Sequence, residues 1–243
     1  MKTMKSIKQI LVATVFLIGV FTISQPLVWA AGATVSGKVA FEGQAPTPKP
    51  INFGAERQCA LMHKDKTPVN EELIVNPNGT VKWALVYVKE GASGTFQAPT
   101  TPVEIDQNGC MFSPHVAAAM AGQKVVFKNG DELLHNIRTE SKINKVFNIA
   151  QPVQGMSTEK IFQEPEVGVH LRCDVHYWMS AYLNILKNPF FAVTGEDGTF
   201  TIKDLPAGTY TLEAWHEKLG TQIQTVTVVD GDQKTFDFTL KHI

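Results

Sequence analysis

The stretch that decides the fold is EVGVHLRCDVHYWM, residues 166–179. Its first half alternates apolar and polar side chains, which predicts a β-strand with one buried face. The residues expected on that face are Val167, Val169, Leu171 and Cys173. His170 lies on the polar face and is expected to be exposed. The strand therefore ends on an inward cysteine, which His176 and Met179 follow at short spacing.

The rest of the chain after residue 30 has the same character, with short alternating runs separated by glycine, proline and asparagine turns. A looser region, residues 51–72, lies between the first two runs. Short strands punctuated by such turns are typical of β-sandwiches, so we predict an all-β protein. The runs expected to be strands are 34–41, 81–89, 103–105, 109–112, 124–129, 135–139 and 166–174, with further strands between 200 and 240.

The length and the net charge of the chain limit the domain number and the kinds of partner that we expect. The 243 residues are enough for two modest domains. Lysine and arginine number 22 against 23 acidic residues, and no basic cluster occurs beyond the N-terminus. Binding to nucleic acid needs a concentrated basic surface, so we expect no nucleic-acid partner.

The first thirty residues are predicted to be a signal peptide. Three lysines precede the apolar run 10–24, and small residues allow cleavage after Ala30. An uncleaved anchor with peripheral membrane association is the alternative. Either way we expect an exported protein, in the periplasm or an equivalent compartment, where disulfides persist.

Four interpretations compete for the residues around Cys173. A buried cysteine and methionine can simply fill the core. Thiolate, imidazole and thioether together are the ligands of a blue copper site, which needs a second histidine. Zinc is a third interpretation, although zinc seldom binds a thioether. A cysteine nucleophile is the fourth, but no orienting group or oxyanion site is evident.

A second histidine occurs in KNGDELLHNI, residues 128–137, where His135 follows a polar turn. Asn136 comes next, and its amide could bond to the backbone near Cys173 and hold the ligand loop in place.

Residues 101–187 resemble the cupredoxin family, the plastocyanin-like electron carriers, in the run from VEIDQNGC through KNGDELLHNI to LRCDVHYWM. The resemblance implies a Greek-key β-sandwich with one type 1 copper per chain. The implied ligands are His135, Cys173 and His176, with Met179 axial. Two residues separate His176 from Met179, where plastocyanin-like members typically have four. Met156 is the reserve candidate for the axial position.

The flanks resemble the carboxypeptidase regulatory-like or prealbumin-like β-sandwich, in VSGKVAFEGQAP (35–46) and in residues 193–220. This implies a second small β-sandwich, in which the N-terminal segment 31–100 completes a C-terminal domain 188–243 around a cupredoxin domain 101–187. The arrangement resembles exported cupredoxin-like proteins labelled methylamine-utilisation proteins.

If Cys173 binds metal, Cys59 and Cys110 remain to form a disulfide. A rival interpretation combines them with His63 and His115 in a metal site of two cysteines and two histidines. We expect His216 and Glu217 to be a surface or capping pair. Beside the ligands, Tyr177 and Trp178 are expected to pack and to shield the metal from water.

These observations predict an exported type 1 copper protein that carries single electrons to and from a partner protein. On this reading it is not an enzyme and needs no small-molecule substrate. The alternatives are a copper-binding or delivery module without a redox partner, and a structural or docking protein with a vestigial metal site.

Overall fold

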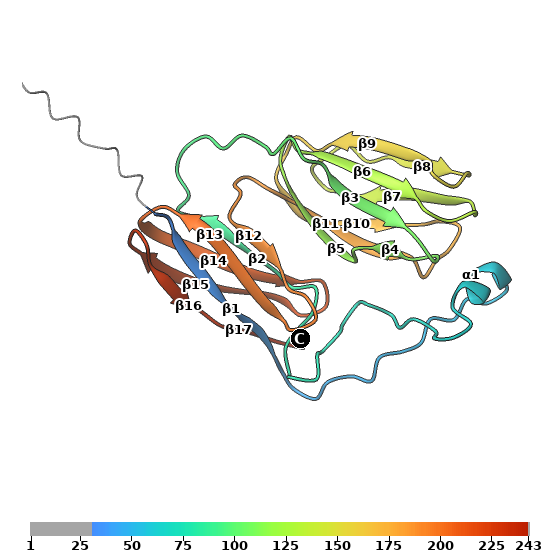
Figure 1. Ribbon diagram of the computed structural model, residues 1–243, viewed down its shortest axis with the longest axis horizontal. Helices are drawn as coiled ribbons and strands as arrows, with labels where there is room; N and C mark the ends of the chain where they lie inside the picture. The colour runs from blue at the N-terminus through green and yellow to red at the C-terminus, as the bar shows by residue number, and fades with distance from the viewer. Residues whose placement is uncertain (1–30, 243) are drawn as a thin grey trace, which may run out of the picture.

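In a computed structural model, which describes residues 31–242, the strands form two β-sandwiches that lie side by side (Figure 1). The predicted all-β fold is confirmed. The predicted signal peptide, residues 1–30, lies outside the described residues. Between residues 31 and 242 no helix has the length and apolar character needed to cross a membrane.

The first sandwich consists of two sheets, with strand orders β5-β11-β10-β7-β8 and β4-β3-β6-β9. Its apolar core includes Ile105, Phe127, Ile137 and Leu171. The strands are β3 (Val103–Gln107), β4 (Phe112–Ser113), β5 (Val116–Met120), β6 (Lys124–Asn129), β7 (His135–Glu140), β8 (Asn148–Gln151), β9 (Ser157–Ile161), β10 (Glu166–Arg172) and β11 (Ser180–Leu186).

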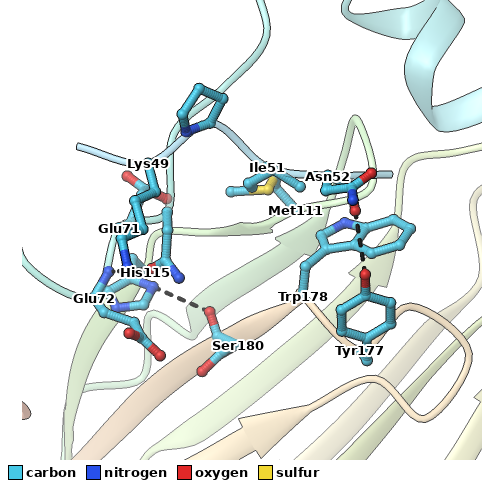
Figure 2. Close-up of a pocket in the computed structure, with 12 residues that line it drawn as sticks. Lys49, Ile51, Asn52, Glu71, Glu72, Met111, His115, Tyr177, Trp178 and Ser180 are labelled. Atoms are coloured by element: carbon cyan, nitrogen blue, oxygen red, sulfur yellow. Dashed lines mark hydrogen bonds between the residues drawn. The ribbon is translucent and has the colours of Figure 1, made fainter. Parts of the chain in front are cut away.

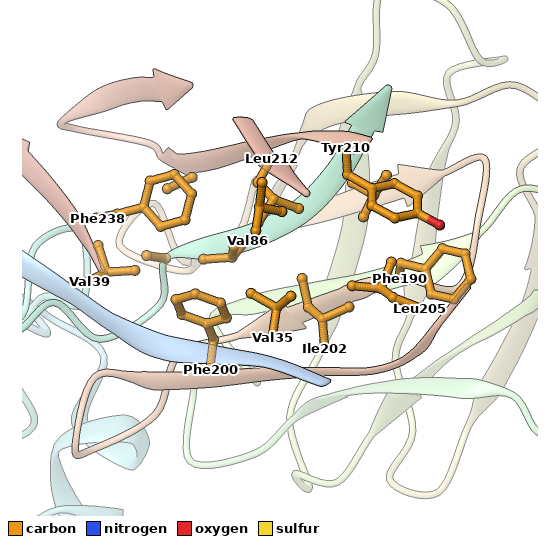
Figure 3. Packing of buried hydrophobic residues seen from close by; sticks show 14 of the residues in the cluster. Val35, Val39, Val86, Phe190, Phe200, Ile202, Leu205, Tyr210, Leu212 and Phe238 are labelled. Carbon is orange, nitrogen blue, oxygen red and sulfur yellow. The ribbon is translucent and has the colours of Figure 1, made fainter. Parts of the chain in front are cut away.

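The second sandwich joins the two ends of the chain. One sheet has the order β12-β2-β14-β15, and in the other β1 pairs with β13, β16 and β17. Figure 3 shows the side chains of the two sheets meeting in one core, among them Val35 and Phe200 from one side and Val86 and Leu212 from the other. The strands are β1 (Ala33–Glu42), β2 (Leu85–Glu90), β12 (Phe191–Val193), β13 (Thr199–Leu205), β14 (Gly208–His216), β15 (Gly220–Val228), β16 (Gln233–Thr235) and β17 (Phe238–Lys241).

Strand β2 is buried on both faces, because the first sandwich covers the face that points away from the second core. Val86 and Val88 belong to the second core. Leu85 and Tyr87 instead pack with Leu186 of β11 in a third cluster between the sandwiches. This double burial explains the nearly unbroken apolar run in this strand.

Strand β10 departs from the predicted alternation at its start. Val169, Leu171 and Cys173 are buried in the first core, as predicted, but Val167 packs against the cluster between the sandwiches. The pairing with β11 shifts register between Glu166 and Val169. Gly168 lies in this irregularity with φ of 82°, and a Cβ there would come within 3.3 Å of the Trp215 ring. Glycine at this position allows the strand to turn and meet the second sandwich.

The expectation that His170 is exposed is wrong. Its side chain is only 25% exposed and stacks on Tyr182. Its ring nitrogens lie 3.0 Å from Glu140 and 2.8 Å from Ser180. Cross-strand neighbours on β7 and β11 supply these partners, which the sequence of β10 alone does not contain.

Candidate metal centre

The candidate ligands meet at one end of the first sandwich because of the strand order. β7 and β10 are antiparallel neighbours, with Arg138 opposite Arg172. The start of β7 and the end of β10 therefore lie together, which places His135 beside Cys173. The loop 173–179 leaves β10 there and adds His176 and Met179.

Three donor atoms converge in this place. One ligand atom each from His135, Cys173 and His176 lies within 4.8 Å of the others. The two histidine Nδ1 atoms are 2.9 Å apart, and Cys173 Sγ is 3.8 Å from His176 Nδ1. The residues are between 0% and 2% exposed, so their donor atoms are shielded from water. Two imidazole nitrogens and a sulfur thus face one small buried space.

Asp131 determines which nitrogen of His135 faces this space. Its carboxylate lies 2.9 Å from His135 Nε2 and accepts hydrogen bonds from the backbone N–H groups of Gly109 and Cys110. Burial raises the pKa of Asp131, but the bonds from His135, Cys110 and Gly109 outweigh it and lower the pKa below its usual value. An ionised carboxylate accepts a hydrogen bond from Nε2–H, so Nδ1 is the nitrogen that faces the other donors.

Asp131 was not predicted from the sequence, although a signal was present. The residue precedes His135 by four positions in the turn between β6 and β7. A carboxylate at this short spacing, next to a candidate ligand, is a reasonable orienting partner.

The surroundings of Cys173 favour the thiolate. Burial raises its pKa, but hydrogen bonds with His135 and His176 and from backbone N–H groups lower it to about 6. One such bond runs from the His176 N–H to Sγ over 3.4 Å. For His135, burial lowers the pKa, and the bonds to Asp131 and Cys173 raise it to about 9. Because the thiolate is the form that binds metals, this environment suits a ligand.

The side chain of Asn136 ties the ligand loop to β7. Its Oδ1 accepts a 2.7 Å hydrogen bond from the Asp174 N–H and lies 3.3 Å from Cys173 Sγ. Its Nδ2 donates to Asn148 over 2.7 Å. The amide therefore fixes the backbone that directly follows the candidate thiolate.

The two candidate methionines have different surroundings. Met179 is 1% exposed and belongs to the first core, while its backbone closes the ligand loop through bonds to His176 and Cys173. Met156, the reserve candidate, is 37% exposed in the turn between β8 and β9.

A segment of the N-terminal flank covers the candidate centre. This covering segment, residues 51–63, contains helix α1 (Arg57–Met62) and lies against the ligand end of the first sandwich. The Cys59–Cys110 disulfide joins the two, which confirms that prediction. Phe53 packs edge-on to Trp178, and Trp178 in turn contacts the His176 ring at 5.2 Å between centroids. His176 is buried because these groups lie over it.

Trp178 and Tyr177 also line a cavity of about 330 Å³ beside the candidate centre. Figure 2 shows Lys49, Ile51 and Asn52 on one side of it, with His115 and Ser180 on the other. Trp178 Nε1 donates to the Cys110 carbonyl over 3.0 Å, so the ring is fixed between the cavity and His176. In the described chain none of the three converging ligands lines this cavity.

The structure overturns two of the sequence-based interpretations. The proposed site of two cysteines and two histidines is not formed, because Cys59 and Cys110 are bonded to each other. His115 instead contacts Ser180 and Glu217.

His216 and Glu217 are not on the surface, although His216 Nδ1 accepts a hydrogen bond from the Lys218 N–H, as a capping residue would. His216 is 1% exposed, and the Glu217 side chain is 3% exposed. They are buried because β14 ends where the second sandwich packs on the first, next to His115.

Comparison with known proteins identifies the C-terminal region. Residues 187–241 match the carboxypeptidase regulatory-like domain family, as the resemblance of the flanks implied. No curated protein matches the chain.

Part of the chain is similar to cupredoxins of known structure. Amicyanin from Paracoccus versutus matches with 15% identity and a TM-score of 0.32, over 42% of this chain and 97% of its own. A purple cupredoxin from Nitrosopumilus maritimus matches with 23% identity and a TM-score of 0.30, over 35% and 99%. A copper-containing nitrite reductase from Thermus scotoductus matches with 20% identity and a TM-score of 0.34, over 39% of this chain but only 24% of its own.

Proposed function

We propose that this protein binds one type 1 copper ion between His135, Cys173 and His176 and carries single electrons. The observation that carries the proposal is the convergence of two Nδ1 atoms and one sulfur, within 4.8 Å of one another, in a buried space. The proposal rests on this geometry and not on the weak similarity to solved structures.

The donor set fits copper better than the alternatives. Two imidazoles and one thiolate, with a weak thioether, are the ligands of blue copper sites. Zinc also accepts two histidines and one cysteine, but it prefers a fourth strong ligand to a thioether. We propose Met179 for the axial position, because it is buried at the end of the same loop while Met156 is partly exposed.

Copper in such a site supplies reversible one-electron chemistry between Cu(I) and Cu(II). Residues of this chain would fix the positions of the ligands. Asp131 orients His135, and Asn136 holds the backbone beside Cys173. Because hydrogen bonds and packing hold the donors in place, little rearrangement is expected when the charge at the centre changes.

The burial of the ligands favours an electron carrier over a delivery protein. Release of a metal would require the loop 173–179 and the covering segment to open, since all three donors are almost inaccessible. Electron transfer needs no such opening. We propose a redox partner protein as the second participant and, because disulfides persist in oxidising compartments, a location outside the cytoplasm.

A copper titration tests the proposal. Residues 31–243 titrated with Cu(II) should develop an intense visible thiolate-to-copper band, with narrow copper hyperfine splitting in the EPR spectrum. Cys173→Ser should lose both, whereas the control Met156→Leu should keep both. A colourless protein that binds zinc as tightly as copper contradicts the proposal. A coloured site that exchanges metal within seconds and shows no reversible voltammetry favours the delivery module instead.

The axial role of Met179 has its own test. Met179→Leu removes the thioether but preserves an apolar side chain of similar volume, so the protein should stay coloured while its reduction potential shifts. Protein-film voltammetry measures the shift. An unchanged potential in Met179→Leu, together with a shift in Met156→Leu, would assign the axial position to Met156.

A further inference from the structure

The Cys59–Cys110 disulfide lies against the candidate copper centre and not only in the scaffold that supports it. Both sulfur atoms and one ring nitrogen of His176 are within 4.8 Å of one another. Cys110 Sγ, one ligand atom of Asp131 and one of His135 also lie within 4.8 Å of one another. The disulfide therefore lies close to both histidines of the proposed centre.

His176 presents its two nitrogens to different groups. Nδ1 faces His135 and Cys173 at 2.9 and 3.8 Å. Nε2 lies 4.0 Å from a carboxylate oxygen of Glu56, which immediately precedes helix α1. Cys59 is in the first turn of that helix. The nitrogen that Cys173 does not use thus points toward the segment that carries Cys59.

Reduction of this disulfide would leave a second set of soft donors. Cys59 and Cys110 are both 0% exposed, and His176 is 2% exposed. Two thiolates and an imidazole in a dry site are ligands that select Cu(I). We propose that the reduced protein binds a second copper, as Cu(I), through the Cys59 and Cys110 thiolates with His176 Nε2 as third donor.

The step that opens this site needs a dithiol reductant. The dithiol supplies two electrons and two protons, the S–S bond breaks, two thiols form, and the dithiol itself becomes a disulfide. Each thiol loses its proton when Cu(I) binds, and Nε2 loses its proton where it becomes a ligand.

Few contacts hold helix α1 of the covering segment in place, so the helix can move after the disulfide is reduced. Helix α1 is six residues long and its first turn has no side-chain cap. Leu61 and Met62 are 58% and 45% exposed, so the side of the helix that they form has few contacts to break. A short, uncapped and largely exposed helix can move at low cost once the disulfide no longer holds it.

The second site should also affect the first. The Gly109 and Cys110 N–H groups bind the carboxylate of Asp131, which orients His135. A metal on Cys110 therefore acts on a ligand of the proposed type 1 centre through one intervening side chain. This inference depends on the proposed function in one respect, which is that His176 would be a ligand of both sites.

Copper stoichiometry tests the inference. The protein is reduced with dithiothreitol, freed of reductant under argon, and titrated with Cu(I) against bathocuproine disulfonate, with free thiols counted in parallel. We expect one Cu(I) per chain with the disulfide intact and two after reduction. The double variant Cys59→Ser/Cys110→Ser should bind one under both conditions. Uptake of a single Cu(I) by fully reduced wild-type protein overturns the inference.

Two further measurements separate this inference from the proposed function. Cys173→Ser should lack the visible band of the oxidised protein yet still bind one Cu(I) after reduction. A wild-type protein without that band, but with Cu(I) uptake that depends on reduction, would refute the type 1 assignment and leave the second site standing. X-ray absorption on wild-type protein needs no variant: the average number of thiolate ligands per copper, counted apart from the weak thioether of Met179, should rise after reduction, and no rise counts against the second site.

Discussion

At the scale of single residues, Asp131 connects the disulfide to the candidate ligands. The backbone of Gly109 and Cys110 holds its carboxylate, and the carboxylate holds His135. Gly109 has φ of 62° and Cys110 has φ of 55°, so this tight turn points two consecutive N–H groups at one anion. The turn therefore positions a candidate ligand through Asp131.

Replacing Asp131 by asparagine tests this connection. Asp131→Asn keeps the shape of the side chain but removes the charge that stabilises the Nε2 proton of His135. We expect copper affinity to fall by about 10- to 100-fold, the range known for partners of metal-bound histidines. Competition titration with a chelator measures the loss. The control is Asp230→Asn, a change of the same chemistry at an exposed turn residue; equal losses in both variants would argue against an orienting role.

At the scale of elements, the first residue of β10 stabilises the loop that follows β7. The carboxylate of Glu166 accepts hydrogen bonds from Ser141 and Asn144 and from backbone N–H groups of residues 142–144. Burial raises the pKa of Glu166, but these bonds outweigh it and lower the pKa to about 2. Strand β10 and its neighbouring loop are thus coupled through one charge.

This coupling predicts a pH dependence of stability. The folded-state pKa of Glu166 lies below its ordinary value of 4.5. Its contribution is therefore complete above about pH 5.5 and is lost as the pH falls toward 2. Glu166→Gln should lower the free energy of unfolding by about 2 to 3 kcal/mol at pH 7 and by much less at pH 2.5.

Urea unfolding at the two pH values measures the difference. Glu164→Gln, an exposed site two residues earlier, serves as the control and should change stability little at either pH. A loss in Glu166→Gln that is equal at both pH values would show that the charge is not the cause.

At the scale of the whole molecule, an apolar contact and a polar contact are among those that join the sandwiches. One is the apolar cluster of Leu85, Tyr87 and Leu186. The other is polar, where His115, directly before β5, contacts Glu217, directly after β14. Both side chains are 3% exposed, so an unpaired partner would remain buried. His216 lies at the same interface. Burial and the neighbouring His115 lower the pKa of its imidazole to about 4.

Breaking the polar contact should be costly. Glu217→Ala leaves Nε2 of His115 buried without a partner, and we expect a loss of about 1 to 3 kcal/mol in the free energy of unfolding. Glu196→Ala is the control: its side chain pairs with Lys82 but is 82% exposed, so the loss should stay within about 0.5 kcal/mol. Chemical denaturation monitored by tryptophan fluorescence compares the two, and similar small losses would show that the interface does not depend on Glu217.

Local pattern was enough to predict several strands and the loop that carries the candidate ligands, but the predicted runs left out β5, β8, β9 and β11, and the run 109–112 is a strand only from Phe112. The alternation of Val169, Leu171 and Cys173 predicted the buried face of β10, because side chains of a strand point to opposite sides in turn. The run 124–129 coincides with β6. Pairing of Cys59 with Cys110 was also predictable, since a chain that is expected to be exported and uses Cys173 as a metal ligand leaves only two cysteines to pair. The strand features depend on neighbours along the chain, whereas the disulfide, between cysteines 51 residues apart, was inferred from the number of cysteines.

The sequence by itself therefore determined an all-β chain with a cysteine–histidine loop at the end of one strand. Only the tertiary structure decided that the covering segment lies over His176, that Asp131 orients His135, and that Glu217 is buried against His115. The physical reason is that these contacts join residues whose meeting depends on how strands pair and sandwiches pack. The alternation of side chains along a single strand predicts which face is buried, but it does not predict which residues pack against that face.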